Sequence, residues 1–436
     1  MQRAHSATSA GIHQILVLSL FALSSLAGWG QKPAKPTPAK IEDGVFLVGE
    51  SVVTNQWSHT LGLVNPPQNV TLLNPGQCIR AAVIATGDDR DALLAKTQLA
   101  FHAQYRGHTE DFSLAAPEST KQIKPEGGDM VTAALAAGGI KNPMLSMASM
   151  GVSAGKWCAP ADAIDGTATV SAEVTTPKGT QKLKKATVQI ESFETGSKKT
   201  LKDEAEISYF TVTYYRQPEP ARLLPALQFV VADETKNPHI GSPIMAAFTS
   251  FLSAALKEAP AGTVRDFQQR VANEQRFGRA VGLVALRSAG YDIQPVLKTW
   301  SEEERKKFES FSKGPDPFDM SPTRELPSHL DMMWAVFGAT GDLEPVKKIA
   351  SALNWRSDYD ALQTLLKTSG ITTITPSIMR GASYSAAGWS LGSFQRTDPL
   401  AADYIEFLIA AADTPELEKK ELSGLDSNPA FKEQKK

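Results

Sequence analysis

The hydrophobic period of this 436-residue chain changes near residue 203, and this change limits the fold more than any other feature. In residues 41–200, apolar and polar residues alternate in short runs between turn residues, which is the period-2 pattern of strands. In residues 203–432, apolar residues recur every three or four positions, which is typical of amphipathic helices. The sequence therefore predicts a two-domain, all-β plus all-α protein.

The alternating half of the sequence has the strand spacing of a β-sandwich. We expect its strands to include residues 45–48, 69–73, 78–84, 97–105, 167–175 and 186–193. One pair of glycines precedes residues 129–137 and another follows them, so we expect one short inserted helix there. The nearest known architecture is the immunoglobulin-like sandwich. Antibody domains place a Trp between two cysteines, and no Trp lies between Cys78 and Trp157, so the likeness is one of architecture only.

Residues 1–27 have the pattern of a signal peptide. Arg3 precedes an apolar run at residues 15–26, and a run of about 12 residues is shorter than the roughly 20 that cross a bilayer as a helix. Ala27 ends a small-x-small cleavage pattern, with Gly30 as the alternative site. We therefore expect a secreted or periplasmic protein, and an uncleaved membrane anchor is the alternative.

A linker is expected at residues 28–40, where prolines alternate with lysines and favour an extended, hydrated chain. No later apolar run is long enough for a membrane span, so no stable membrane insertion is expected after cleavage. Cys78 and Cys158 are the two cysteines of the chain, and an even pair in an exported protein is typical of a disulfide. Such a bridge would stabilise the fold by roughly 4 kcal/mol in the loop-entropy model.

Helix-start signals are frequent in residues 203–432. Ser301 and Glu304 have the spacing of a capping box. Three further segments begin with an acidic residue and Pro, at Glu219-Pro220, Glu344-Pro345 and Asp398-Pro399. Each pair follows an aromatic segment, which is typical of helical hairpins that lie side by side. Their spacing is irregular, so an irregular α-helical hairpin bundle is favoured over a regular solenoid.

The charge balance excludes one class of partner. Lys and Arg total 45 and Asp and Glu total 47, which gives a formal net charge of −2. Nucleic-acid-binding domains carry a basic excess, so no nucleic-acid partner is expected. One local group of lysines could meet an anionic envelope polymer, or could protect an exposed strand edge. Its members are Lys182, Lys184, Lys185, Lys198, Lys199 and Lys202.

Two segments match the nucleophile pattern Gly-x-Ser-x-Gly, with Ser153 and Ser390 at their centres. Hydrolases of this type place the catalytic His after the Ser in the chain. No His follows Ser390, and the small residues around it are typical of a helix that packs closely against another. Ser153 precedes His239 and His329, so Ser153 with either His is the catalytic alternative that the residue order permits.

No glycine-rich nucleotide loop and no metal-binding spacing of His and Cys occurs in the sequence, so no cofactor and no metal is expected. A cluster of methionines could bind a soft metal or fill a core. Its members are Met130, Met144, Met147 and Met150.

These patterns favour an exported, non-enzymatic binding protein of the cell envelope, with an unknown envelope protein or polymer as its partner. No catalytic residue is assigned under this interpretation. The alternative is an exported serine hydrolase that uses Ser153 with His239 or His329.

Overall fold

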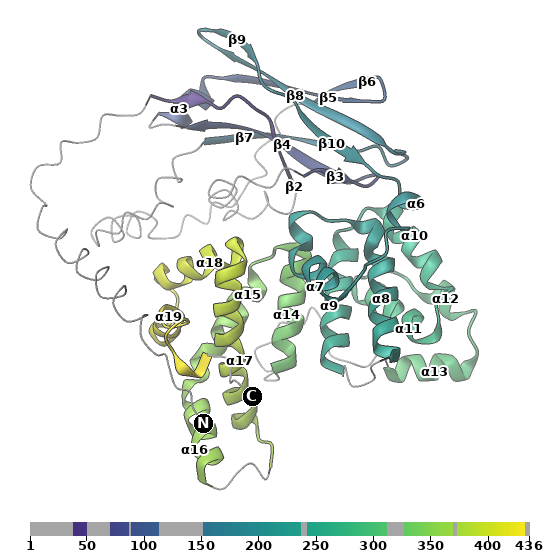
Figure 1. Cartoon of the computed structure of the whole chain (residues 1–436), viewed down its shortest axis with the longest axis vertical. Helices are drawn as coiled ribbons and strands as arrows, with labels where there is room; N and C mark the ends of the chain where they lie inside the picture. The colour runs from purple at the N-terminus through teal and green to yellow at the C-terminus, as the bar shows by residue number, and fades with distance from the viewer. Residues whose placement is uncertain are drawn as a thin grey trace, which may run out of the picture.

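The computed structural model describes residues 38–49, 70–86, 89–112, 151–236, 242–311, 327–368 and 373–431. Figure 1 shows the strands gathered in one part of the molecule and the long helices in the other. The change falls between β10 (Ala186–Ile190) and α7 (Glu204–Thr213). The β-rich N-terminal region and the helical C-terminal region are therefore confirmed, while the domain limits at 41–200 and 203–432 stay predictions.

Several sequence predictions fall outside the described residues. These are the signal peptide at 1–27, residues 28–37 of the linker predicted at 28–40, and the inserted helix at 129–137. They stay predictions.

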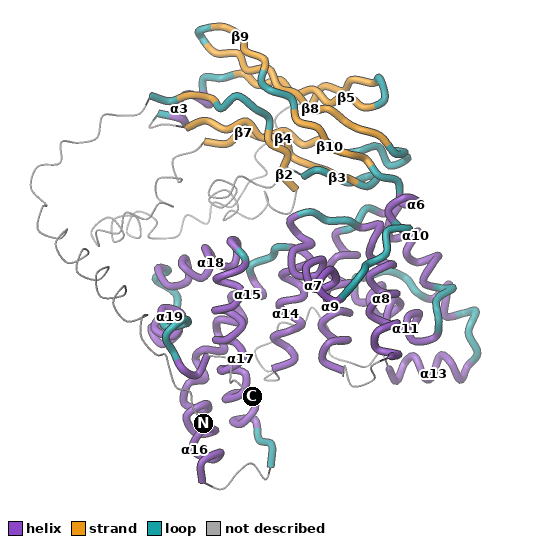
Figure 2. The backbone as a smooth tube through the Cα atoms, viewed as in Figure 1, coloured by secondary structure: helices purple, strands orange, loops and turns teal. Residues whose placement is uncertain are grey.

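Two sheets make up the β-rich region (Figure 2). In the first sheet, β4 (Cys78–Thr86) pairs with β1 (Lys40–Ile41) and β2 (Phe46–Gly49) on one side and with β7 (Gly151–Cys158) on the other. The second sheet follows the order β3 (Leu72–Leu73), β10, β8 (Gly166–Thr176), β5 (Gln98–Tyr105) and β6 (His108–Phe112), and β9 (Gly179–Lys182) also pairs with β8. All pairs are antiparallel except β3 with β10. The immunoglobulin-like arrangement of these strands stays a prediction.

The two sheets share an apolar core that follows the predicted alternation. Along β8, Ala168, Val170, Ala172 and Val174 are all buried. Gly155 of β7 lies against a pair of phenylalanine rings from the second sheet. An added Cβ at Gly155 would lie 2.9 Å from the ring of Phe112 and 3.0 Å from that of Phe101, so only glycine permits this approach of the two sheets.

Two short helices lie within residues 41–200, where the alternation predicts none, one between β4 and β5 and one after β10. They are α3 (Arg90–Ala95) and α6 (Phe193–Gly196). The strand expected at 186–193 is too long by three residues, because Ser192 begins α6 and its hydroxyl accepts from the Thr195 N–H at 3.3 Å.

Helices form nearly all of the described structure after residue 203. Their bounds are α7 (Glu204–Thr213), η2 (Tyr214–Arg216), η3 (Pro220–Arg222), α8 (Leu223–Lys236), α9 (Ser242–Glu258), α10 (Ala261–Val271), α11 (Arg276–Ser288), α12 (Gln294–Leu297), α13 (Glu302–Phe311), α14 (Pro327–Thr340), α15 (Glu344–Ser351), η4 (Ala352–Trp355), α16 (Arg356–Thr368), α17 (Pro376–Thr397), α18 (Pro399–Ala410), α19 (Glu416–Ser423) and η5 (Pro429–Phe431). The capping box is confirmed, because the Glu304 N–H donates to Ser301 Oγ at 3.3 Å and the Ser301 N–H donates to Glu304 Oε2 at 3.0 Å.

Helix α14 belongs to both apolar cores of the helical region. Val336 and Ala339 pack in a core formed with α8, α9 and α11. Trp334 and Phe337 pack in a second core formed with α15, α17 and α18. The long helices therefore form one continuous array around α14, as Figure 1 shows.

The strand region and the helical region meet at the turn that follows β3. Asn74 is 1% exposed, and its Nδ2 donates to the Glu191 carbonyl oxygen at 2.8 Å. Asn74 Oδ1 accepts from the Ala221 N–H at 3.2 Å, and Gln77 Nε2 donates to the Pro218 carbonyl oxygen at 3.2 Å. We call these five residues the domain joint. Their hydrogen bonds tie the end of the sandwich to the start of the helices.

Candidate functional site

The hydrolase candidates occupy different parts of the fold. Ser153 lies within β7, where its backbone is paired with that of Val83 in β4. His329 lies in α14 and is 4% exposed, and Figure 1 shows β7 and α14 well apart. His239 lies outside the described residues. Ser153 is thus inside a paired strand, whereas a nucleophile elbow is a strand-to-helix turn. Catalysis by Ser153 with either His stays a prediction.

Ser390 lies inside α17, where its Oγ donates to the Ala387 carbonyl oxygen at 3.1 Å. The glycine before it serves close packing, because the ring of Phe431 fills the space that a Gly388 side chain would need. An added Cβ at Gly381 would lie 2.7 Å from the Asp358 carbonyl oxygen of α16. Gly388, the first residue of this Gly-x-Ser-x-Gly segment, therefore lets α17 pack closely against η5, and Gly381 earlier in the same helix does the same against α16.

The soft-metal hypothesis concerns Met130, Met144, Met147 and Met150, all of which lie outside the described residues. Among the residues that the structure describes, no group of three or more His, Cys, Asp and Glu side chains is placed to hold a metal ion. Within the same part of the chain, no helix combines the length and the apolar character that crossing a membrane requires.

A buried polar cluster joins α16, α17 and α19. The Tyr384 hydroxyl donates to Glu421 Oε2 at 2.7 Å, and Asn428 Nδ2 donates to the same oxygen at 2.9 Å. Arg356 Nη1 donates to the Tyr384 hydroxyl oxygen at 3.1 Å. Burial raises the pKa of Tyr384 well above its usual value, and the hydrogen bond to Glu421 acts in the same direction. These groups bind one another, so the cluster holds three helices together.

A second buried cluster lies at the start of α18. Asp398 is 1% exposed and accepts from the Tyr215 hydroxyl at 2.9 Å and from the Ala401 N–H at 3.0 Å. Arg216 forms an ion pair with the same carboxylate. Burial is the main cause that raises the pKa of Tyr215. The Asp-Pro signal predicts the cap at Asp398, but no local spacing points to its partners so much earlier in the chain.

Four of the six clustered lysines have carboxylate partners. The pairs are Lys182 with Glu173, Lys184 with Asp43, Lys198 with Glu194 and Lys199 with Glu191. Because these four cations each have an anion beside them, the group presents less net positive charge to a polyanion than its six lysines would suggest. This geometry does not favour an anionic polymer as the partner.

Exposed apolar side chains gather at the end of the hairpin formed by α16 and α17. Leu365 is 37% exposed, Leu366 52% and Ile374 71%. Residues 361–379 contain a single charged residue, Lys367, although 21% of the whole chain is charged. Figure 1 shows this end of the hairpin reaching beyond the other helices, on the side away from the strands. We call Leu365, Leu366 and Ile374 the hairpin tip, and it is the candidate interaction surface.

Comparison with protein-family models and with curated proteins found no match to this chain.

Proposed function

We propose that this chain is an exported, non-enzymatic binding protein of the cell envelope, and that its hairpin tip contacts a partner protein. The observation that carries the proposal is the grouping of three exposed apolar side chains at the end of a helical hairpin, where residues 361–379 contain a single charged residue. Single exposed apolar residues are normal on any surface, whereas a group of them marks an interaction site. Cys78 and Cys158 form the expected disulfide in the structure. This bond supports the export part of the proposal, since disulfides persist in oxidising compartments.

The chemistry of the tip favours an apolar groove on a protein as its partner. A polyanion would be attracted by cations, and within residues 361–379 the hairpin carries Lys367 alone. Burial of the exposed parts of the three side chains contributes about 3 kcal/mol, at roughly 2 kcal/mol for each fully buried side chain. This contribution alone is smaller than the binding free energy of a complex with a millimolar dissociation constant. A protein groove can also contact the sides of α16 and α17, and these contacts add to the binding free energy. A flat bilayer contacts the tip alone and lacks this addition.

A photo-crosslinking amino acid placed at position 366 of the full chain tests the proposal in the native envelope. We expect one protein to be captured reproducibly from this position. The matched control is position 244 in α9, because Ile244 is 53% exposed and Leu366 is 52% exposed. Capture of lipid alone, or of the same proteins from both positions, would contradict a partner that binds at the tip.

The hydrolase alternative has its own test. Under the proposed function, the Ser153→Ala chain keeps full binding of the captured protein, and any ester hydrolysis in the preparation is unchanged. Loss of a measured hydrolysis on this substitution would replace the binding proposal with the hydrolase.

A further inference from the structure

We propose that the Cys78–Cys158 disulfide is a redox latch on the domain joint, opened by an external dithiol such as that of a thiol–disulfide exchange protein. Opening the bridge would loosen the turn that ties the sandwich to the helices. This inference does not depend on the hairpin tip.

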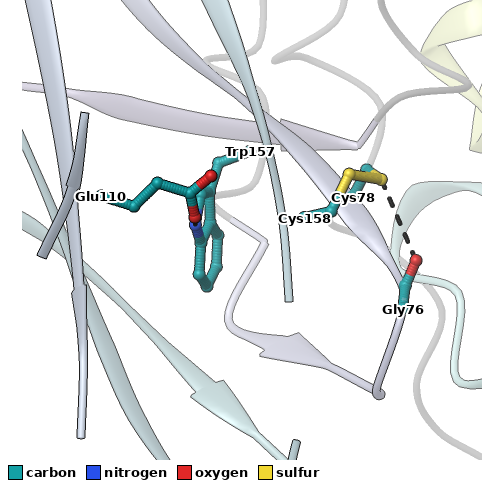
Figure 3. The surroundings of a disulfide bond; sticks show 5 residues. All are labelled: Gly76, Cys78, Glu110, Trp157 and Cys158. Carbon is teal, nitrogen blue, oxygen red and sulfur yellow. Dashed lines mark hydrogen bonds between the residues drawn. A yellow bond between two sulfur atoms is a disulfide. The ribbon is translucent and has the colours of Figure 1, made fainter. Parts of the chain in front are cut away.

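The disulfide joins the ends of two paired strands. Cys78 is the first residue of β4, Cys158 is the last residue of β7, and the two are direct partners in the antiparallel register. Their strand neighbours Ile79 and Trp157 are buried in the sandwich core, and Trp157 donates from Nε1 to Glu110 Oε2 at 3.1 Å (Figure 3). Neighbouring residues on a strand face opposite sides, so the bridge lies outside the core. It can therefore open without exposing the core to water.

Solvent reaches the bridge from the Cys158 side. Cys158 is exposed, and Cys78 is half-buried. Thiol–disulfide exchange requires a thiolate to reach one sulfur atom of the bridge. Cys158 Sγ is the sulfur atom that an external thiolate reaches first.

The exchange balances as a two-electron reduction. One thiolate of the dithiol bonds to Cys158 Sγ, the Cys78–Cys158 bond breaks, and Cys78 leaves as a thiolate that takes up a proton. The second thiol of the dithiol then attacks the mixed disulfide and releases Cys158 as a thiol. The dithiol ends as a disulfide, and the protein ends with two thiols.

The turn beside the bridge, which contains Gly76, lies between Asn74 and Gln77 of the domain joint. Gly76 has φ +79°, and its N–H donates to the Ala159 carbonyl oxygen at 3.1 Å. An added Cβ at Gly76 would lie 3.3 Å from Pro260 Cβ, so this turn also touches the start of α10. Figure 3 shows the carbonyl oxygen of Gly76 next to the Cys78 sulfur, at 3.9 Å. The bonds to the helical region therefore come from the turn that precedes Cys78, where Asn74 binds the Ala221 N–H and Gln77 binds the Pro218 carbonyl oxygen.

Loss of the bridge is expected to loosen the joint first. Strand ends separate more readily than strand centres, and the bridge closes the end of the β4–β7 ladder. The Ala159 N–H donates to the Gln77 carbonyl oxygen at 2.9 Å just beyond the bridge, and we expect this bond to be lost when the bridge opens. Gln77 and Asn74 then lose the fixed turn from which they bind the helices.

Hydrogen exchange of the full chain, before and after treatment with dithiothreitol in native buffer, tests the latch. We expect the bridge to be reduced without denaturant, and the amides of Gly76 and Ala221 to exchange at least about tenfold faster in the reduced chain. The amides of β5 and β8 serve as the internal control and keep their protection. Glutathione is expected to form its mixed disulfide at Cys158, as identified by peptide mass spectrometry.

Two results would overturn the latch. One is a bridge that dithiothreitol reduces only when the whole chain unfolds, since the disulfide is then an inert staple. The other is a reduced chain in which the amides of Gly76 and Ala221 exchange at the unchanged rate. The Asn74→Ala chain separates the two parts of the mechanism, because these two amides should exchange fast in it while its disulfide is intact.

Discussion

At the scale of single residues, buried polar side chains decide how the two regions of the chain are fixed to each other. Asn74 is the clearest case, because its one amide group binds a strand end at Glu191 and a helix start at Ala221. A buried backbone group that loses its partner has a desolvation cost of about 1–3 kcal/mol. The side chain therefore contributes more to the joint than its small apolar contact would suggest.

Replacement of Asn74 by Ala should lower the free energy of unfolding by about 2–3 kcal/mol, because two buried backbone groups lose their bonds. Urea denaturation followed by circular dichroism measures this value. Asn273→Ala is the control, since Asn273 is exposed and its side chain donates to the Gln269 carbonyl oxygen of the preceding helix α10, and its effect should stay within about 0.5 kcal/mol. Equal effects of the two substitutions would show that Asn74 does not hold the joint.

Glu418 gives the fold a pH dependence of unusual sign. Glu418 is 4% exposed, and burial raises its pKa above the usual value near 4.5. The folded chain therefore holds this proton more tightly than the unfolded chain, and stability falls as the pH rises from about 4.5 through the raised pKa. Glu418→Gln keeps an acceptor for Asn354 and carries no charge.

We therefore expect Glu418→Gln to increase the free energy of unfolding at pH 7.5 and to leave it unchanged at pH 4. Urea denaturation at both pH values measures the difference. Glu416→Gln is the control, because that side chain is 91% exposed and should give no difference at either pH. A stabilisation that is equal at both pH values would contradict the assigned cause.

At the scale of secondary-structure elements, the glycines of α17 have opposite roles within one helix. Gly388 receives the ring of Phe431, whereas an added Cβ at Gly392 would have its nearest neighbour, Arg396 Nη1, at 3.5 Å. Glycine costs a helix about 1 kcal/mol relative to alanine. At Gly388, the helix preference favours alanine but the packing requires glycine. At Gly392, the packing leaves room for the alanine that the helix preference favours.

Gly388→Ala should destabilise the chain by about 1–3 kcal/mol through overpacking, while Gly392→Ala should be neutral or stabilise by up to about 1 kcal/mol. Thermal unfolding of the two variants gives both values, and each variant is the control for the other. If both substitutions stabilise the chain, the contact between α17 and η5 is not as close as the structure has it.

The sequence predicts elements far better than it predicts their contacts. The period-2 alternation correctly places β8 and β5, and the capping box of Ser301 correctly marks the start of α13, because these signals are local. The strand expected at 186–193 ends early because a local cap at Ser192 prevails over the alternation. The hydrogen-bond partners Arg356 and Glu421 of Tyr384 come from two other helices, α16 and α19, and no spacing within one segment identifies them.

The sequence contains a signal for the hairpin tip, but this signal does not distinguish an exposed tip from a buried segment. The stretch 361–379 is almost free of charge, but uncharged stretches occur equally in buried cores. Only the packing shows that Leu366 and Ile374 are exposed.

At the scale of the whole molecule, the disulfide is the one covalent link between two segments that lie far apart in the sequence. It closes a loop of 80 residues and lies outside the sandwich core. The loop-entropy model assigns it about 4 kcal/mol of stabilisation through the unfolded state. The fold should therefore survive its removal with reduced stability.

The variant with Cys78→Ser and Cys158→Ser should keep its circular dichroism spectrum and lose up to about 4 kcal/mol of unfolding free energy. The wild-type chain, unfolded in urea with dithiothreitol present, is the control and should give the same value. A variant as stable as the oxidised wild type would show that the bridge does not constrain the unfolded chain.

The most direct test of the account is the affinity of the protein captured from position 366 for three forms of the full chain, measured by isothermal titration calorimetry. We predict that Leu366→Asp with Ile374→Asp weakens binding at least about tenfold, since charges at the tip cannot enter an apolar groove without a large desolvation cost. Ile244→Asp should bind like the wild type. Equal affinity of all three forms would contradict the claim that the hairpin tip is the binding surface.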